Sequence, residues 1–174
     1  MVKAVNLRDF IRDIPDFPVE GVMFRDVTPL LRNAHAFKTA IDKMVEMLSD
    51  LDFSCIVAPE ARGFIFGSVI SYVMNKGFVP IRKPGKLPYE TASIKYDLEY
   101  GTAELQMHVD GLIKNERVVL IDDVLATGGT AYAIAQLVQK LEATMVGMGF
   151  LAELSYLNPK SKLKGFDVRS LIVY

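Results

Sequence analysis

The fold of this 174-residue chain is decided by one stretch, Val118-Val119-Leu120-Ile121-Asp122-Asp123-Val124-Leu125-Ala126-Thr127-Gly128-Gly129-Thr130. Its first four residues are aliphatic, which predicts a strand buried on both faces. Two aspartates follow, and a tight turn of small residues leads into a predicted helix with Ile134, Leu137, Val138 and Leu141 on one stripe. A strand, a turn and a helix in this order are typical of an α/β fold.

The same alternation extends along the chain in both directions. Apolar stripes predict helices over 37–48 and 63–74, the second apolar nearly all round and therefore buried against a sheet. Apolar runs predict short strands over 55–58, 78–81, 117–121, 145–151 and 170–174, and a weaker alternation predicts one over 103–109. Strands that alternate with helices favour a mainly parallel central sheet flanked by helices, in a single domain spanning 1–174.

Two segments do not fit this alternation. Residues 1–33 show neither period clearly, and we expect them to form a small N-terminal hood over the ligand end of the sheet. Residues 83–101 begin with turn-forming Lys83-Pro84-Gly85-Lys86-Leu87-Pro88 and show no helical stripe afterwards. A connection of this length is usually functional, so we expect a mobile active-site loop over 83–101.

Composition excludes several classes of protein. Hydrophobic residues make up 51% and charged residues 24% of the chain, and the net charge is −1, which favours a packed core and gives no basic patch for nucleic acid. No apolar run approaches the roughly 18 residues of a membrane span, and the first six residues open no long apolar region. The one cysteine, Cys55, lies in an apolar run and is expected to be a buried core thiol. A cytoplasmic location is expected.

The turn after the central strand has the features of a phosphate site. Ligands of open parallel sheets bind beyond the carboxyl ends of the strands, where Asp122 and Asp123 are expected. Glycine at 128 and 129 allows positive φ and close approach of backbone, and N–H groups at a helix start attract anions. Thr127 and Thr130 add hydroxyl groups. A phosphate cradle beside two acids suits a ribose 5-phosphate, whereas neither a P-loop motif nor a dinucleotide-binding glycine motif is present.

The stretch 118–130 resembles the phosphoribosyl-pyrophosphate signature of type I phosphoribosyltransferases. The resemblance implies the fold of that family. It also implies that Asp122 and Asp123 hold the ribose hydroxyls, directly or through Mg²⁺-bound water, with no metal bound directly by the protein. Residues Ala126, Thr127, Gly128, Gly129 and Thr130 would wrap the 5-phosphate.

Further segments resemble adenine phosphoribosyltransferases over nearly the whole chain. They are Asp16-Phe17-Pro18 with 21–30 in the hood, Pro59-Glu60-Ala61-Arg62-Gly63-Phe64, Arg82 to Pro88, Leu98-Glu99-Tyr100-Gly101, and Ala152-Glu153-Leu154. The resemblance implies purine salvage, in which the 5-phosphoribosyl group passes from phosphoribosyl pyrophosphate to adenine and gives AMP and pyrophosphate. It also implies Mg²⁺ as cofactor and a homodimer.

The same resemblance assigns roles to individual residues. Arg62 and Lys83 would bind the pyrophosphate, Lys86 would contact the same donor or AMP, and the Glu60-Ala61 peptide is often cis in the family. Ala61 stands where the family commonly has a small polar residue, so one hydroxyl is missing from the phosphate shell. The faces of adenine would lie between Val22, Phe24 and Leu154, with main-chain groups around Arg25 reading its amino edge. The mechanism, rather than the resemblance, makes Glu99 at the far end of the loop the candidate general acid/base for the adenine ring nitrogens, with Glu104 as a second candidate.

Three other functions remain open from the sequence. A phosphoribosyltransferase for hypoxanthine or xanthine would keep the donor motif, but the hood sequence argues against it. A sensor of phosphoribosyl pyrophosphate that controls transcription or RNA would share the fold, yet no DNA-binding helix-turn-helix or basic arm is visible. A receiver-like signalling domain is suggested only by the Asp-Asp pair, and it would need neither glycine at 128–129 nor the long loop.

Overall fold

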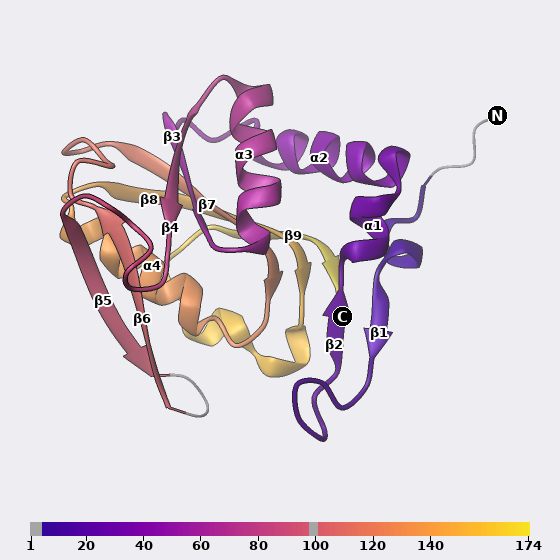
Figure 1. Cartoon of the computed structure of the whole chain (residues 1–174). Helices are drawn as coiled ribbons and strands as arrows, with labels where there is room; N and C mark the ends of the chain where they lie inside the picture. The colour runs from indigo at the N-terminus through magenta and orange to yellow at the C-terminus, as the bar shows by residue number, and fades with distance from the viewer. Residues whose placement is uncertain (1–4, 98–100) are drawn as a thin grey trace.

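The computed structural model describes residues 5–97 and 101–174 (Figure 1). A five-stranded parallel sheet forms the centre, with the order β4-β3-β7-β8-β9. The strands are β3 (Cys55–Pro59), β4 (Gly77–Ile81), β7 (Arg117–Leu125), β8 (Thr144–Glu153) and β9 (Val168–Val173). The predicted α/β fold with a mainly parallel sheet is therefore confirmed.

Helices cover both faces of this sheet. The α-helices are α1 (Thr28–Arg32), α2 (Ala34–Leu48), α3 (Arg62–Met74) and α4 (Gly129–Lys140), and short 3₁₀ turns are η1 (Leu7–Phe10), η2 (Ser155–Leu157) and η3 (Pro159–Ser161). Side chains alternate along β3, so that Cys55 and Val57 join the core under α4 while Ile56 joins the core under α1, α2 and α3. Each strand thereby contributes to two apolar layers.

Two antiparallel hairpins flank the sheet. The hood contains β1 (Arg12–Ile14) and β2 (Phe24–Asp26), and β5 (Thr91–Asp97) pairs with β6 (Thr102–His108) at the opposite side of the view in Figure 1. The expectation of a loop throughout 83–101 is wrong for 91–97, because β5 is a regular strand. It is held on α4, where Lys140 Nζ donates to the Ser93 carbonyl over 3.0 Å.

Two further expectations are corrected in detail. The helix α3 is not buried all round: Phe66 and Ile70 are in the core, but Ile65, Tyr72 and Val73 are exposed. The central strand continues past Ile121 to Leu125, so the two aspartates lie within β7 and not after it. Its pairing with β8 provides this extension, because Asp122 lies opposite Phe150 and Leu125 opposite Glu153.

Cys55 is a core thiol, as expected. It is buried in β3, and burial raises the pKa of its thiol to about 11, which keeps it protonated at neutral pH. In the parts of the chain that the structure describes, none of the helices combines the length and the hydrophobicity that a membrane crossing requires.

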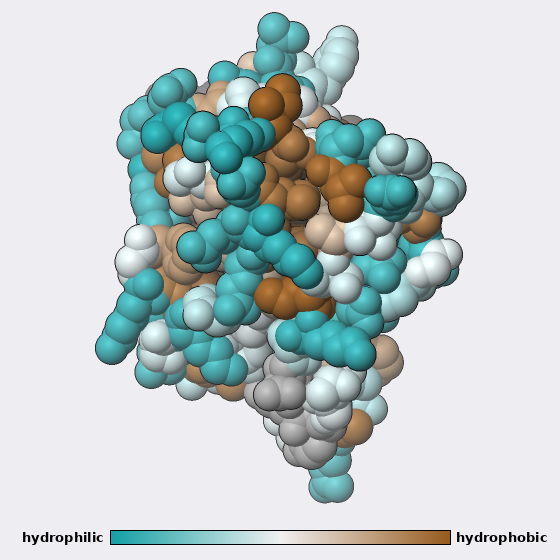
Figure 2. Space-filling model, turned by 90° about the vertical axis from the view of Figure 1, so that its left-hand side faces the viewer, coloured by the Kyte–Doolittle hydropathy of each residue, from teal (hydrophilic) through white to brown (hydrophobic). Residues whose placement is uncertain are grey.

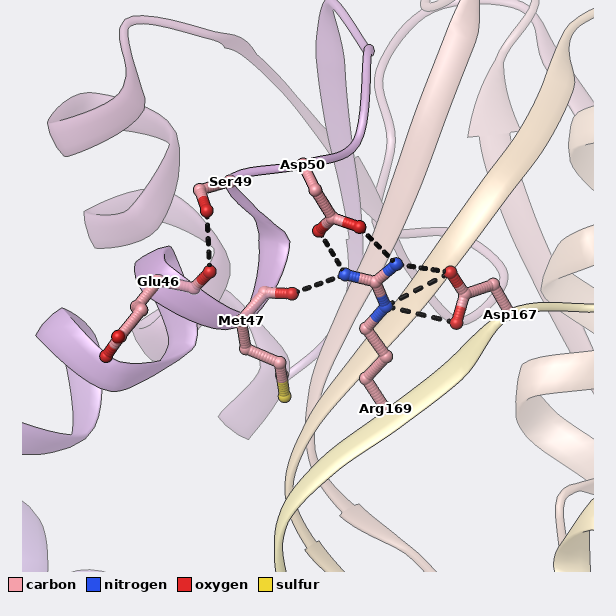
Figure 3. A network of polar contacts seen from close by, with 6 residues as sticks. All are labelled: Glu46, Met47, Ser49, Asp50, Asp167 and Arg169. Carbon is pink, nitrogen blue, oxygen red and sulfur yellow. Dashed lines mark hydrogen bonds and ion pairs between the residues drawn. The ribbon is translucent and has the colours of Figure 1, made fainter.

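A charged network joins α2 to β9 at the amino end of the sheet (Figure 3). Arg169 Nη2 donates to Asp50 over 3.0 Å, its Nε donates to Asp167 over 3.0 Å, and its Nη1 donates to the Met47 carbonyl over 2.6 Å. Hydrogen bonds from Arg169 hold the pKa of Asp50 below its ordinary value. A planar guanidinium that binds three partners contributes more to stability than an isolated ion pair on the surface does.

Replacing Arg169 with methionine should lower the melting temperature by roughly 2–6 °C, since three acceptor groups lose their common donor. The pKa of Asp50 is lowered in the folded state, so this stabilisation is present at neutral pH and is lost as the pH falls through that lowered pKa. Thermal unfolding of both proteins, followed from pH 7 down to about 3, should show the difference narrowing in acid.

Lys38→Met is the matched control for this variant, because Lys38 makes a single exposed ion pair with Asp42. It should shift the melting temperature by less than about 1 °C. An equal effect of the two variants would contradict a special contribution from the Arg169 network.

Candidate active site

The topology places a crevice at the carboxyl ends of β3 and β7. After β3 the chain forms β4 on one side of it and later β7 on the other, which is the point where strand order reverses and ligands bind in open sheets. Residue pairing between β3 and β7 ends at Val57 with Leu120, whereas β7 continues beside β8. Beyond Leu120, one side of β7 is therefore open to the crevice.

Two carboxylates project from this part of β7. Asp123 is only 3% exposed and forms an ion pair with Arg62 Nε, while an Asp122 oxygen accepts the Asp123 N–H over 2.8 Å. Burial, followed by the charge of Asp123, raises the pKa of Asp122 well above its ordinary value. The site thus holds two closely spaced acids, of which Asp122 is costly to ionise without a cationic or hydroxyl partner.

A loop of small residues follows the acids and opens helix α4. Gly128 is the N-cap of this helix, with φ of +80°, and a Cβ there would lie 2.8 Å from the Pro159 carbonyl oxygen. Glycine is thus required both by conformation and by the close approach of a second segment. The first N–H groups of α4 have no intrahelical acceptor and carry the positive end of the helix dipole, so this turn suits an anion.

The first cavity, of about 450 Å³, contains the acids and this turn. Its polar wall is formed by Glu60, Arg62, Lys83, Tyr96, Asp122, Asp123, Thr127, Gly128 and Thr130. Tyr96 comes from β5, and its hydroxyl lies 3.2 Å from the Thr130 hydroxyl. The β5–β6 hairpin thereby closes one side of the anion-binding turn.

The second cavity, of about 300 Å³, lies under the hood. It is lined by Gly21, Val22, Met23, Phe24, Arg25, Arg62, Val124, Ala126, Thr127, Leu154, Tyr156 and Leu157. The Arg62 guanidinium lies over the Phe24 ring at 5.0 Å from its centroid. Arg25 is held by an ion pair with Asp13 and lies 3.9 Å from the Tyr174 ring centroid. An apolar slot of this kind suits a flat heteroaromatic ring.

The two cavities adjoin each other. They share Arg62, Val124, Ala126 and Thr127 as lining residues. A ligand whose anionic end lies at the α4 turn can therefore reach a flat ring in the second cavity where these four shared residues lie.

The structure brings together most of the residues selected from the sequence. Lys86 is an exception, since it lines neither cavity and its carbonyl only accepts a bond from Arg82 Nη1 over 3.1 Å. Gly129 begins α4 without lining a cavity, and Lys83 lines the first cavity although it is exposed. Glu99 lies outside the described residues. Glu104 is on β6 away from both cavities.

Sequence reasoning missed Glu60 and Tyr96. The Glu60 carboxylate accepts hydrogen bonds from Lys83 N at 2.8 Å and from Arg82 Nε at 2.9 Å, and these donors, the Lys83 N–H first, hold its pKa below the ordinary value. The Glu60-Ala61 peptide is cis, as the family resemblance suggested. Glu60 could have been selected from its place in the motif 59–64, whereas Tyr96 could not, because its position depends on strand β5, which the sequence does not reveal.

Comparisons with known proteins agree with this arrangement. A model of the family described as "Phosphoribosyl transferase domain" matches residues 30–165, so fold and site define a phosphoribosyltransferase. A relative from Pseudothermotoga lettingae, named adenine phosphoribosyltransferase, is 65% identical over 98% of this chain and 100% of its own length. The chain belongs to the adenine phosphoribosyltransferases within that family.

Solved structures give the same result. Adenine phosphoribosyltransferase from Thermoanaerobacter pseudethanolicus superposes with a TM-score of 0.95 at 49% identity, covering 97% of this chain and 98% of that one. The enzyme from Saccharomyces cerevisiae, solved in complex with D-2,5-dideoxy-2,5-imino-altritol 1,6-bisphosphate and adenine, has a TM-score of 0.87 at 36% identity and covers 93% and 94% of the two chains.

Proposed function

We propose that this chain transfers the 5-phosphoribosyl group of phosphoribosyl pyrophosphate to adenine, which yields AMP and pyrophosphate. The observation that carries the proposal is the junction of an acidic, anion-binding cavity with an apolar slot. The first suits a phosphorylated sugar and the second a purine base. The complex of the yeast relative with adenine and a bisphosphate supports this pairing of ligands.

The donor occupies the first cavity in this proposal. Its 5-phosphate accepts hydrogen bonds from the turn Ala126–Thr130, and its ribose hydroxyls face Asp122 and Asp123. Its pyrophosphate lies toward Arg62 and Lys83, because a leaving group with several charges needs cations and N–H donors. Lys86 keeps no role in the proposal without movement of its loop.

Adenine occupies the second cavity. Its faces contact Val22, Phe24 and Leu154, of which Leu154 is buried, and main-chain groups around Arg25 meet its amino edge. A 6-oxopurine reverses the donor and acceptor pattern on that edge, so it would leave buried polar groups unpaired. Selection among bases therefore follows from hydrogen bonding within an apolar slot.

Mg²⁺ is the proposed cofactor, bound with the donor. Among residues 5–97 and 101–174, no cluster of three or more His, Cys, Asp or Glu could hold a metal by itself. The residues nevertheless fit Mg²⁺, which usually keeps several waters and binds one or two carboxylates together with substrate phosphates. Asp122 and Asp123 would hold the ion through its bound water beside the donor, and it would supply positive charge that stabilises the departing pyrophosphate.

The chemistry requires no covalent nucleophile from the protein. Breaking the bond between ribose C1 and pyrophosphate gives an oxocarbenium-like transition state, as in glycoside hydrolysis. The chain's residues orient the donor, hold adenine for attack, and exclude water that would hydrolyse the donor. The shared wall at Arg62 and Thr127 is where the two substrates meet in this proposal.

Glu99 is the proposed general acid/base for the adenine ring nitrogens. Glu99→Gln should lower kcat by about 10²- to 10⁴-fold while changing the KM of either substrate by less than about threefold. Steady-state kinetics on the purified variant would measure both. Glu104→Gln tests the second candidate and should keep the wild-type kcat, and an unchanged kcat for Glu99→Gln would remove the assignment.

We propose a homodimer that acts in the cytoplasm. Exposed hydrophobic side chains on one helix, Ile65, Tyr72 and Val73 of α3, support an interface between copies. Figure 2 also shows hydrophobic residues gathered near the centre of the face on the β5–β6 side, with hydrophilic residues around them. Sedimentation equilibrium at several concentrations would separate a dimer from a monomer.

A base-competition assay tests the proposed function. The protein is incubated with phosphoribosyl pyrophosphate, Mg²⁺ and adenine, hypoxanthine, guanine or xanthine in turn, and pyrophosphate release is followed. Turnover with adenine alone is the expected result. Turnover with an oxopurine would overturn the base assignment, and donor binding without turnover would favour the sensor function.

A further inference from the structure

One buried carboxylate has no part in the reaction described above. Glu153, the last residue of β8, is 3% exposed and lies between β7 and β9, opposite Leu125 and Val173. Burying a carboxylate is costly unless it is paired and hydrogen-bonded. Its position at the carboxyl end of the sheet places it next to Leu154 of the second cavity.

Glu153 has two partners from different segments. One of its oxygens, Oε2, accepts a hydrogen bond from Ser170 Oγ on β9 at 2.9 Å and lies 3.1 Å from Lys160 Nζ in η3. Lys160 keeps its amino group at this inner carboxylate although about half of its side chain is exposed. The ion pair therefore fixes η3 to the end of the sheet.

The segment fixed in this way touches the anion-binding turn. Pro159 precedes Lys160 and is buried, and its carbonyl oxygen lies 2.8 Å from where a Cβ of Gly128 would stand. The same segment contributes Tyr156 and Leu157 to the second cavity. The stretch 154–160 thus forms a wall that lines the second cavity and packs, through the Pro159 carbonyl, behind Gly128 of the first.

We infer that Glu153 and Lys160 are positioning residues, whose ion pair holds the 154–160 wall against Gly128 and so sets the shape of the phosphate-binding turn. This inference rests on the proposed function. A looser wall lets the turn move away from the 5-phosphate, whereas the groups at the reacting bond stay in place. Breaking the ion pair should consequently weaken the binding of phosphorylated ligands more than it lowers turnover.

Lys160→Met is the main test, since it keeps the aliphatic stem and removes the charge. We expect the KM for phosphoribosyl pyrophosphate and the Kd for AMP to rise about 5- to 20-fold, as is usual when a supporting residue is removed. The KM for adenine should rise as well, because Tyr156 and Leu157 line the second cavity, whereas kcat should change by less than about threefold. Steady-state kinetics and calorimetric titration with AMP supply these values.

Two lysine variants control the result. Lys160→Arg restores the ion pair and should bind AMP within about twofold of the wild type. Lys162→Met removes an exposed lysine two residues away and should leave all constants unchanged. Glu153→Gln should reproduce the Lys160→Met effect, and the double variant should be no worse than either single one, because both remove the same interaction.

The outcomes separate the inference from the proposed function. A wild-type protein that fails to convert adenine would refute the function itself. An active wild type together with normal AMP binding by folded Lys160→Met would overturn the positioning inference alone. A fall in kcat at unchanged KM, or an equal effect of Lys162→Met, would overturn it as well.

Discussion

Replacing Asp122 and Asp123 together by asparagine is expected to lower kcat/KM by at least about 100-fold while the protein stays folded. Both carboxylates face the first cavity, and asparagine is nearly isosteric but carries no negative charge and offers one acceptor oxygen in place of two. The variant should show this loss at saturating Mg²⁺ and retain the circular dichroism of the wild type.

Asp110→Asn is the control, because Asp110 is an exposed carboxylate in the turn after β6. It should keep the wild-type kcat/KM. Near-normal turnover in the double variant would remove both aspartates from the proposed site, even if the family assignment stands.

The single variant Asp122→Asn should also be more stable than the wild type without ligands. The folded pKa of Asp122 is raised, so stability is present below its unfolded pKa and is lost as the pH rises through the folded pKa. A neutral amide does not incur this loss. With EDTA and no substrate, we expect a higher melting temperature for the variant at pH 7 and equal values below about pH 4.

This opposition between stability and activity would be informative. A ligand site that holds ionisable groups close together is destabilising until its ligands arrive. If Asp122→Asn melted below the wild type at neutral pH, the hydrogen bond from Asp123 N to the carboxylate would outweigh the cost of burying that charge beside Asp123. The loss of activity could then not be separated from loss of structure.

The sequence predicts those elements whose residues are apolar on a regular period. The stretch 118–130 combines a buried strand, acids and a glycine turn, and α2 shows a helical stripe. The sequence therefore predicts the positions of both to within a few residues. The strand β5 was missed because its inward residues are Ala92, Ile94 and Tyr96, of which Ile94 and Tyr96 are only partly buried. Its order comes from pairing with β6 and packing on α4, which no local pattern reveals.

The same limit applies to the site. Val22, Phe24, Arg25 and Leu154 could be selected by resemblance, and the structure places all four on one cavity. Lys86 was also selected by resemblance, but the direction of a side chain in a turn depends on contacts such as that of its own carbonyl with Arg82. The Glu153–Lys160 pair was invisible because it joins a strand end to a 3₁₀ turn through tertiary structure alone.

Gly63→Ala should lower both stability and activity, although the same change in most helices is stabilising. Gly63 is in the first turn of α3, where alanine normally gains about 0.5–1 kcal/mol over glycine. Here the added Cβ would lie 2.8 Å from Pro59 Cδ and 2.9 Å from Asp122 Oδ1. Neither a proline ring in a buried strand nor a carboxylate held by its neighbour's N–H can move without disturbing the site.

We expect this crowding to cost about 1–3 kcal/mol of stability and the displacement of Asp122 to reduce kcat/KM about 10- to 100-fold. Thermal unfolding and steady-state kinetics measure the two effects. Ser68→Ala, at an exposed position of the same helix, is the control and should be neutral or slightly stabilising. A Gly63→Ala protein that melts normally yet loses activity would place the strain on Asp122. A Gly63→Ala protein that is destabilised yet fully active would place the strain on Pro59. A variant with normal stability and normal activity would show that position 63 does not require glycine.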